Sequence, residues 1–325
     1  MNQNGCILTL GAAVVDIPLC PVDKNTFEKD VCMLDDISMT VGGDALNEAT
    51  VLARLGYRTR LVTMVGSDPA GDFILRHCKE TGIDAGYLKV RGDVSTSINI
   101  PLIMPDGQRV FVTNRNGSTW KFCLEDIDFR AFDGVRVLSL DSIFVNPKLD
   151  VSALKTIFTE AKKRGVLICA DLIKCRFGET LKDVESALQY VDYLFSNPEE
   201  AQALTQEREI GRMAEAFLKA GVGHVIIKDG SRGAYIAAGA ERYLEPAYGK
   251  ANCVDTTGAG DNFASGFIAA LLEGKSLSEC GKFANAVASI AIEKVGAVTA
   301  VRTREQVEQR YRDYLNAYPA VLKQA

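Results

Sequence analysis

The chain has 325 residues, enough to bury a sizeable core as one large α/β domain or two smaller ones. Its net charge of −5 and its pI near 5.3 argue against nucleic-acid binding, which needs a basic face. The nine cysteines are scattered without a C-x-x-C pair, which favours free thiols in a reducing compartment, and no apolar run approaches the ~20 residues of a membrane helix. We therefore expect a soluble cytoplasmic protein that binds small molecules and has neither a nucleic acid nor a membrane as a partner.

Apolar stretches of strand length alternate along the chain with segments of helical period. The first stretch is CILTLGAAVVD, and later ones include RVLSLDSIF, GVLICADL, VDYLFSN and HVIIKDG. Between them lie helix candidates at residues 45–55, 71–81, 151–164 and 210–220. Continuous apolar strands that alternate with helices are typical of a mainly parallel sheet covered on both faces. The predicted fold class is therefore α/β, with a doubly wound, mainly parallel sheet.

Two segments interrupt this alternation, residues 17–40 and residues 97–115. Both look like extended strands, and the second contains SINIPLIMPDGQRVFVT, a candidate hairpin that turns at Pro105, Asp106 and Gly107. Together they are expected to form a small β lid inserted into a single domain that spans residues 1–325.

Polar residues follow the first predicted strand and open the first predicted helix. Asp16 is an acceptor at a strand end, where ligand sites of α/β sheets gather. In VGGDALNEATVLARLG, Gly42 and Gly43 precede a helix that carries Asn47 near its start. Backbone N–H groups and the Asn47 amide could recognise a polyhydroxylated substrate. A tight strand-to-helix turn explains the same residues equally well, and Asp16 alone is ambiguous.

The stretch CVDTTGAGDNFASGF places Gly258, Ala259 and Gly260 between two carboxylates, Asp255 and Asp261. Glycines let backbone N–H groups converge, and the helix predicted to follow adds the positive end of its dipole, so an anion is the expected ligand. A carboxylate there would repel that anion unless it takes a proton from the attacking group. We predict an anion hole for phosphoryl transfer with Asp261 as the catalytic base. The alternative is that Asp261 only favours the helix start electrostatically.

The D-T-T-G-A-G-D block, the G-G-x-x-x-N block with its A-R-L-G ending, and VGSDPAGDF resemble the signature regions of the ribokinase-like (PfkB) carbohydrate kinases. The resemblance covers essentially the whole chain in the right order. It implies an α/β domain with a small β lid that often pairs two subunits, and hence a homodimer. The implied reaction is transfer of the γ-phosphoryl group of ATP, with Mg²⁺ as cofactor, to a hydroxymethyl group of an unphosphorylated sugar.

The resemblance also implies roles for individual residues. Asp261 would be the catalytic base, with the N–H groups of Gly258, Ala259 and Gly260 as the anion hole. The implied sugar ligands are Asp16, Gly42, Gly43, Asn47 and Asp141. The implied nucleotide-binding residues are Asn197, Glu200, Lys228, Gly230, Ser231, Gly233 and Asn285, of which Asn197 and Glu200 would hold Mg²⁺ through water. A monovalent cation such as K⁺ is implied at Asp255, Thr257, Ala291, Lys294 and Gly296.

Several positions depart from the family pattern and leave the substrate open. Asp44 stands where relatives commonly carry a lysine or a small residue, and Asp141 is one methylene shorter than the usual glutamate. The sequence assigns no role to Asp171, Lys174 and Arg176 in ADLIKCRFGE, nor to Arg109 and Arg115 in the lid, which could grip an acidic sugar or be solvated charges.

Two other functions compete with a sugar kinase. A nucleoside kinase would need an apolar slot for the base, for which Phe111, Trp120 and Phe122 are candidates. A sugar sensor that keeps the fold without catalysis would have no use for Asp261 beside its glycine turn. A sugar is favoured because Asp16, Asp44, Asn47 and Asp141 would make a strongly polar pocket.

Overall fold

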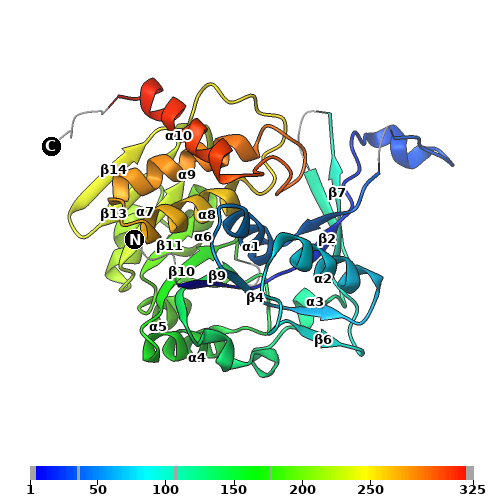
Figure 1. Ribbon diagram of the computed structural model, residues 1–325, viewed down its shortest axis with the longest axis horizontal. Helices are drawn as coiled ribbons and strands as arrows, with labels where there is room; N and C mark the ends of the chain where they lie inside the picture. The colour runs from blue at the N-terminus through cyan, green and yellow to red at the C-terminus, as the bar shows by residue number, and fades with distance from the viewer. Residues whose placement is uncertain (1–4, 35–36, 106–108, 176–177, 320–325) are drawn as a thin grey trace.

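An eight-stranded, mainly parallel sheet lies at the centre of the structure, a computed structural model that describes residues 5–34, 37–105, 109–175 and 178–319 (Figure 1). In spatial order its strands are β14 (Glu241–Glu245), β13 (Ala234–Ala238), β12 (His224–Lys228), β11 (Tyr193–Ser196), β10 (Leu167–Leu172), β9 (Val135–Ile143), β1 (Cys6–Leu10) and β4 (Thr59–Val62). The strands from β12 to β4 run parallel, whereas β13 and β14 extend one edge antiparallel.

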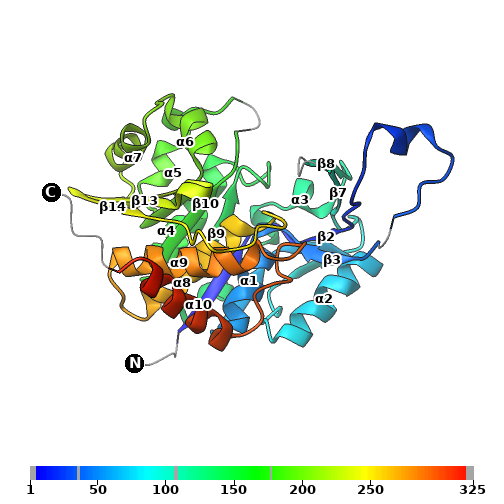
Figure 2. The ribbon, with the colours of Figure 1, turned by 90° about the horizontal axis from the view of Figure 1, so that it is seen from above.

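Helices cover both faces of this sheet, because successive strand residues point to opposite sides and both sets are apolar. In β1, Ile7 belongs to one hydrophobic core and Leu8 to the other. The first core is completed by α1 (Asp44–Arg54), α2 (Pro69–Thr81), α8 (Ala259–Leu272), α9 (Leu277–Ala291) and α10 (Arg304–Ala317). The second core is completed by α4 (Val151–Lys163), α5 (Leu181–Leu188), α6 (Pro198–Thr205) and α7 (Ile210–Lys219). Figure 2 shows the two helical layers on either side of the sheet, which confirms the predicted fold class.

The short helical elements are α3 (Ser118–Lys121), η1 (Lys24–Glu28), η2 (Leu124–Asp126), η3 (Phe129–Phe132) and η4 (Gly230–Arg232). Within the described ranges, every helix is too short or too polar to span a bilayer.

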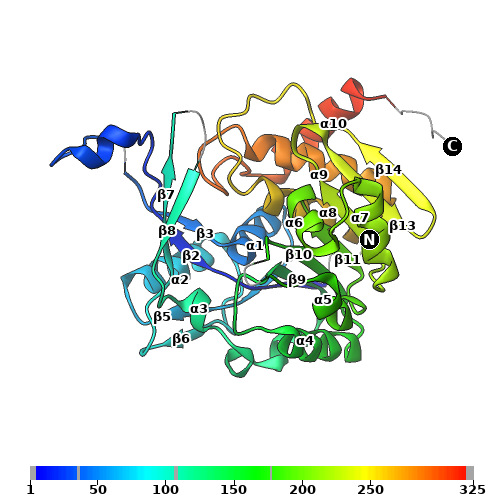
Figure 3. The same ribbon diagram turned by 180° about the vertical axis from the view of Figure 1, so that it is seen from behind.

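A separate four-stranded sheet lies beside the main sheet (Figure 3). Its order is β3 (Thr40–Gly42), β2 (Val14–Asp16), β7 (Ile98–Ile103) and β8 (Arg109–Thr113). Strands β7 and β8 pair antiparallel within predicted segment 97–115, although Asp106 and Gly107 of the expected turn lie outside the described residues. A two-stranded parallel sheet, β5 (Met64–Gly66) with β6 (Lys89–Arg91), was not expected from the sequence.

The prediction of extended strands across residues 17–40 is wrong. Among the described residues of this segment, strand structure is limited to Thr40 at the start of β3 and to a single bridge between Leu19 and Leu102, and the part between them carries the 3₁₀ turn η1 and projects from the small sheet (Figure 1). The N–H groups of Ile17, Leu19 and Val22 donate to the carbonyls of Asn99, Pro101 and Ile103, so the chain stays beside β7 up to the last residue of that strand. Asp23 then caps η1 by accepting from the backbone of Thr26 at 3.0 Å.

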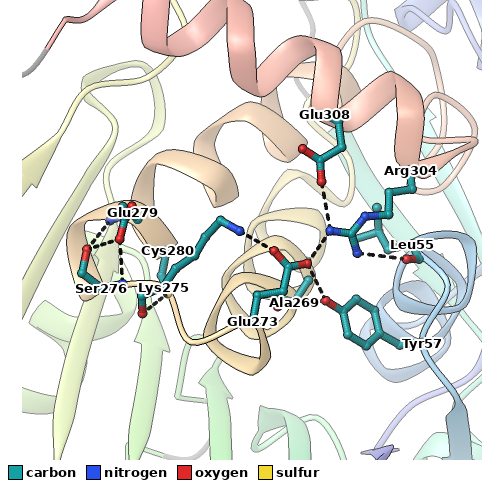
Figure 4. A network of polar contacts seen from close by, with 10 residues as sticks. All are labelled: Leu55, Tyr57, Ala269, Glu273, Lys275, Ser276, Glu279, Cys280, Arg304 and Glu308. Carbon is teal, nitrogen blue, oxygen red and sulfur yellow. Dashed lines mark hydrogen bonds and ion pairs between the residues drawn. The ribbon is translucent and has the colours of Figure 1, made fainter. Parts of the chain in front are cut away.

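A polar network fastens the C-terminal ends of α1 and α8 to α10 (Figure 4). Tyr57, just beyond α1, donates to Glu273 Oε1 at 2.8 Å and to the Ala269 carbonyl of α8 at 3.0 Å. Glu273 also forms ion pairs with Lys275 and with Arg304 at the start of α10. Burial raises the pKa of Glu273, but these donors outweigh burial and lower it. The network therefore fixes the relative placement of two helices whose opposite ends carry the candidate motifs.

We predict that Glu273→Gln lowers the free energy of unfolding by about 1–3 kcal/mol, because Arg304 and Lys275 lose their shared carboxylate in a half-buried site. Glu308→Gln is the matched control. Glu308 contacts Arg304 at 2.9 Å but is more exposed, so its loss should cost only about 0.5 kcal/mol or less. Urea unfolding of both variants makes the comparison, and equal losses would contradict a central role for Glu273.

Candidate active site

Helices α1 and α8 both begin at a glycine whose backbone is left-handed. Gly43 has φ 87° and Gly258 has φ 71°. A Cβ on Gly43 would lie 2.6 Å from the Ala12 carbonyl oxygen, and one on Gly258 would lie 2.6 Å from Ala297 Cβ. No other residue fits either position without displacing backbone. The two glycine motifs therefore build the starts of two helices, where the helix dipole favours negative charge. At the start of α8 the Ala259 N–H donates to the Thr256 carbonyl at 3.2 Å.

One hydrogen bond joins these two helix starts. Asn47 of α1 donates through Nδ2 to Asp261 Oδ2, in the first turn of α8, at 2.7 Å. Burial raises the pKa of Asp261, while the Asn47 hydrogen bond and the positive charge of Lys228 lower it and so favour the ionised carboxylate. The bond fixes the orientation of the predicted base.

Lys228, the last residue of β12, places a positive charge beside the start of α8. Its Nζ lies 3.2 Å from the position that a Cβ on Gly260 would occupy, and it forms an ion pair with Asp171 of β10. Burial lowers the pKa of Lys228, but Asp171 and Glu200 outweigh burial and raise it. Lys228 therefore stays charged next to the predicted anion hole.

Two cavities meet at this point. The first has a volume of about 490 Å³, and the second has a volume of about 660 Å³. The residues that line both are Asp44, Thr256, Gly260 and Asp261. A ligand in one cavity and a ligand in the other would thus approach each other beside the Asp261 carboxylate.

The wall of the first cavity is polar and includes atoms that lack partners. Asp16 Oδ1, Asn47 Oδ1 and Thr119 Oγ1 are buried and accept no hydrogen bond from the described residues. Burial raises the pKa of Asp16 to about 6 against the opposing hydrogen bond from Asn99. Unpaired polar atoms at a cavity wall are costly unless a ligand satisfies them, and hydroxyl groups can do so.

The small sheet supplies one side of the first cavity. The sequence predicted only some of the residues that line this cavity. Phe111 and Trp120 line it as the nucleoside alternative requires, whereas Phe122 is buried in the core. Gly43 is a lining residue, and Gly42 packs behind the wall, where a Cβ would lie 2.0 Å from Asp16 Oδ2. Lining residues that the sequence did not suggest include Asn99, Thr113 and Thr119, whose signal was their position in and after the predicted lid segment.

The second cavity gathers every predicted nucleotide-binding residue: Asn197, Glu200, Lys228, Gly230, Ser231, Gly233 and Asn285. Asn197 and Glu200 also form a capping box at the start of α6, since the Glu200 N–H donates to Asn197 Oδ1 at 2.9 Å and the Asn197 N–H donates to Glu200 Oε2 at 2.7 Å. Burial raises the pKa of Glu200 to about 7, and Lys228 opposes this. The capping box by itself accounts for the N-x-x-E spacing. That Asn197 and Glu200 also hold Mg²⁺ through water stays a prediction. The apolar lining residues Tyr248, Phe263 and Ile292 were not predicted.

Asp141 lies outside both large cavities, contrary to its expected place at the sugar. It is 1% exposed, and Ser139 Oγ lies 2.9 Å from its Oδ1 and 2.8 Å from Oε2 of Glu48, also 1% exposed. Burial raises the pKa of Asp141 well above its usual range and that of Glu48 to about 8. The pair therefore holds a proton at neutral pH. Glu48 was missed by sequence reasoning, although its signal was a charged residue one turn after Asp44 among the apolar positions of α1.

Asp255 ties the turn before α8 to the loop after α9. Its Oδ1 accepts from the Thr257 N–H at 2.9 Å, and its Oδ2 accepts from the Gly296 N–H at 2.8 Å. The other predicted cation residues are Ala291, which ends α9, and Lys294, which is exposed. Across the described ranges, no cluster of three or more His, Cys, Asp or Glu side chains is arranged to hold a metal ion.

The remaining basic candidates contribute little to the cavities. Lys174 and Arg115 are exposed, Arg176 lies outside the described residues, and the side chain of Arg109 is not described. Asp171 lines the second cavity, paired with Lys228 as above.

Over most of its length the chain is similar in sequence and in fold to known carbohydrate kinases. A family model for pfkB family carbohydrate kinases matches residues 7–304. Ribokinase from Staphylococcus aureus is 27% identical over 274 residues, which cover 82% of this chain and 87% of that protein. 2-Dehydro-3-deoxygluconokinase from Haemophilus influenzae is 28% identical over 278 residues, covering 79% and 87%. The structure of Arabidopsis thaliana ribokinase complexed with ribose and ATP is 25% identical, with a TM-score of 0.80 over 95% of this chain and 99% of that one.

We predict that the fold loses stability as the pH rises from about 5 to about 8, and that Glu48→Gln makes this dependence shallower. Glu48 holds its proton up to a pKa of about 8 when folded but releases it near 4.5 when unfolded, so the folded state binds more protons across that window. Urea unfolding at several pH values measures the slope.

The matched control for this prediction is Asp133→Asn, which changes an exposed carboxylate that pairs with Arg164 at the surface. It should leave the slope unchanged. A slope equally steep in wild type and in Glu48→Gln would show that Glu48 does not hold the proton.

Proposed function

The chain belongs to the pfkB family of carbohydrate kinases and is therefore a phosphotransferase, and we propose that it transfers the γ-phosphoryl group of ATP to a hydroxymethyl group of an unphosphorylated sugar. One observation carries this proposal: the two cavities share Asp261 and Gly260 at the start of α8. The sugar would occupy the first cavity and the nucleotide the second. Their reacting ends would then meet beside the Asp261 carboxylate at the start of α8.

Asp261 would act as the general base in this reaction. Asn47 holds its carboxylate in place, and Lys228 beside it helps to keep it ionised. In phosphoryl transfer the protein forms no covalent intermediate that it must stabilise. Its contribution to the rate comes mainly from positioning the two substrates and stabilising the charge of the transition state. The N–H groups of Gly258, Ala259 and Gly260, with Lys228, would stabilise the charge that spreads over the transferred group.

Mg²⁺ would neutralise phosphate charge in this reaction, and Asn197 and Glu200 would hold it through water. A monovalent cation such as K⁺ would bind near Asp255, whose hydrogen bonds already hold the neighbouring loop against the start of α8. We also propose that the enzyme works in the cytoplasm, as its free cysteines suggest.

The polarity of the first cavity favours a sugar as the acceptor. Asp16, Asp44, Asn47 and Asn99 line it, and two of them present buried oxygens without partners. The alternative, a nucleoside kinase, is favoured by Phe111 and Trp120 in the same wall, because aromatic rings can stack on a base. Coupled ADP release from MgATP across pentoses, hexoses, sugar acids and nucleosides, with and without K⁺, distinguishes them. Ligand binding without any ADP release would instead indicate a sensor.

The small sheet supports a homodimer. Side chains alternate along β8, so Phe111 faces the cavity while Val110 and Val112 face the other side, where they are 51% and 49% exposed. An exposed apolar strand face of this kind is suited to a second copy of the chain. We propose that two lids pack together through this face.

We predict that Asp261→Asn lowers kcat by about 100-fold or more, because the amide cannot accept the hydroxyl proton, and leaves ATP affinity within about threefold of wild type. Steady-state kinetics and calorimetric titration with ATP measure the two effects. Asp133→Asn, remote and exposed, should match wild type in both. A variant that keeps more than about a tenth of wild-type kcat would remove Asp261 from the role of base.

We predict that Val112→Glu converts a dimer into a monomer, because a charge on each copy would be placed in the apolar contact. Light scattering after size-exclusion chromatography measures the mass. Glu241→Lys, on the outer strand β14, is the control and should leave the dimer intact. A monomeric wild-type protein at micromolar concentration would contradict the lid interface.

A further inference from the structure

The loop of residues 295–301, which lies between α9 and α10, packs against the start of α8. A Cβ on Gly258 would lie 2.6 Å from the Ala297 Cβ, so Ala297 fills the space behind this glycine. Asn262 of α8 is fully buried, and its Nδ2 donates to the carbonyls of Gly258 at 2.7 Å and of Ala297 at 2.8 Å. The 295–301 loop therefore backs the turn that the proposed mechanism uses as its anion hole.

Arg54, the last residue of α1, binds the same loop from another element. Its Nη1 donates to the carbonyl of Val301 at 2.8 Å and also to the carbonyl of Val298. Among the described residues no carboxylate forms an ion pair with Arg54, and burial together with the charge of Arg302 lowers its pKa. A half-buried charge without a counter-ion is costly unless hydrogen bonds satisfy it. The guanidinium group is thus committed to the two carbonyls of the 295–301 loop.

A basic residue in the last turn of a helix also suits the negative end of the helix dipole. Arg54 meets that description, but the dipole requires neither of its contacts with a loop that is more than two hundred residues away in sequence. Helix α1 therefore contacts both parts of the proposed reaction centre. Asn47, near its start, donates to Asp261, and Arg54, at its end, holds the loop behind Gly258.

We propose that Arg54 is a positioning residue for phosphoryl transfer, which acts by holding the 295–301 loop against the start of α8. This rests on the proposed function, because it takes the start of α8 as the anion hole. Arg54 lines neither cavity, so it acts on the reaction through the loop and not by contact with a substrate. Stabilisation of the transition state depends on exact donor positions, whereas binding of the two substrates is spread over many contacts.

The first test separates the rate of the transfer step from substrate binding. Arg54→Ala should lower kcat by about 10-fold or more, because the loop and the turn in front of it are no longer held in place. The KM for the best sugar from the ADP-release panel and the calorimetric Kd for ATP should stay within about threefold of wild type. An arginine that served only to stabilise the fold would instead lower the free energy of unfolding and leave the kcat of the folded enzyme unchanged.

The second test restores the missing group. Guanidinium chloride, at concentrations well below those that unfold the variant, should raise the kcat of Arg54→Ala severalfold, because the free ion can donate to the same two carbonyls. Sodium chloride at the same concentration should not. Wild type under the same conditions shows any effect of guanidinium that does not depend on Arg54.

Arg302→Ala is the matched control, since Arg302 also donates to the 295–301 loop, at the Thr299 carbonyl at 2.6 Å, but is exposed. It should keep kcat within about threefold of wild type and show no rescue by guanidinium. If Arg54→Ala fails to fold, Arg54→Lys decides, because lysine supplies the same charge to the helix dipole without the guanidinium group and should still lower kcat.

Three results would overturn the assignment of Arg54. They are a wild-type kcat in Arg54→Ala or in the deciding Arg54→Lys variant, a loss of kcat that guanidinium does not restore in Arg54→Ala, and an equal loss in Arg302→Ala. All three are measured against an active wild type and so concern Arg54 alone. A wild-type enzyme that releases no ADP with any sugar or nucleoside would overturn the proposed function, and the role of Arg54 with it.

Discussion

The hydrogen bond from Asn47 to Asp261 is the interaction on which the site depends. It joins the first turns of α1 and α8, two helices that are more than two hundred residues apart in sequence, at 2.7 Å. Both helices begin at left-handed glycines that pack directly on neighbouring backbone or side chain, so neither start can shift without strain. At their other ends Tyr57 and Glu273 hold the same pair of helices together. The geometry of the candidate site is thus set by two helices that are held together at both ends.

Several buried or half-buried carboxyl groups lie around the starts of α1 and α8, and their pKa values are shifted. Burial raises the pKa values of Asp16, Asp44, Glu48, Asp141, Glu200 and Asp261. Lys228 and the helix starts supply positive charge near the second cavity. Of these carboxyl groups, Asp16 lines the first cavity, Glu200 lines the second, Asp44 and Asp261 line both, and Glu48 and Asp141 line neither. In the proposed reaction, the phosphate would approach from the second cavity and the hydroxyl group from the first, and the two would meet beside Asp261.

The sequence predicted the parts of the structure that local patterns control. Apolar alternation indicated the covered sheet, and glycine followed by helical period located the starts of α1 and α8. The strands expected across residues 17–40 were wrong because, among the described residues, backbone pairing with β7 reaches only to Val22, opposite the last residue of that strand, and the chain then turns into η1. The burial of Asp141 against Glu48 and the entry of Asn99 into the first cavity depend on tertiary packing. No local pattern in a single sequence specifies which carboxylates pair with each other.

The most direct test of the arrangement is a crystal structure with a non-hydrolysable ATP analogue, Mg²⁺ and the preferred sugar bound together. The sugar should fill the first cavity and the nucleotide the second, with the reacting hydroxyl about 2.6–3.2 Å from the Asp261 carboxylate. The terminal phosphate should lie against the N–H groups of Gly258, Ala259 and Gly260. A sugar whose hydroxymethyl group points away from Asp261, or a phosphate bound away from the start of α8, would contradict the assignment of the two cavities.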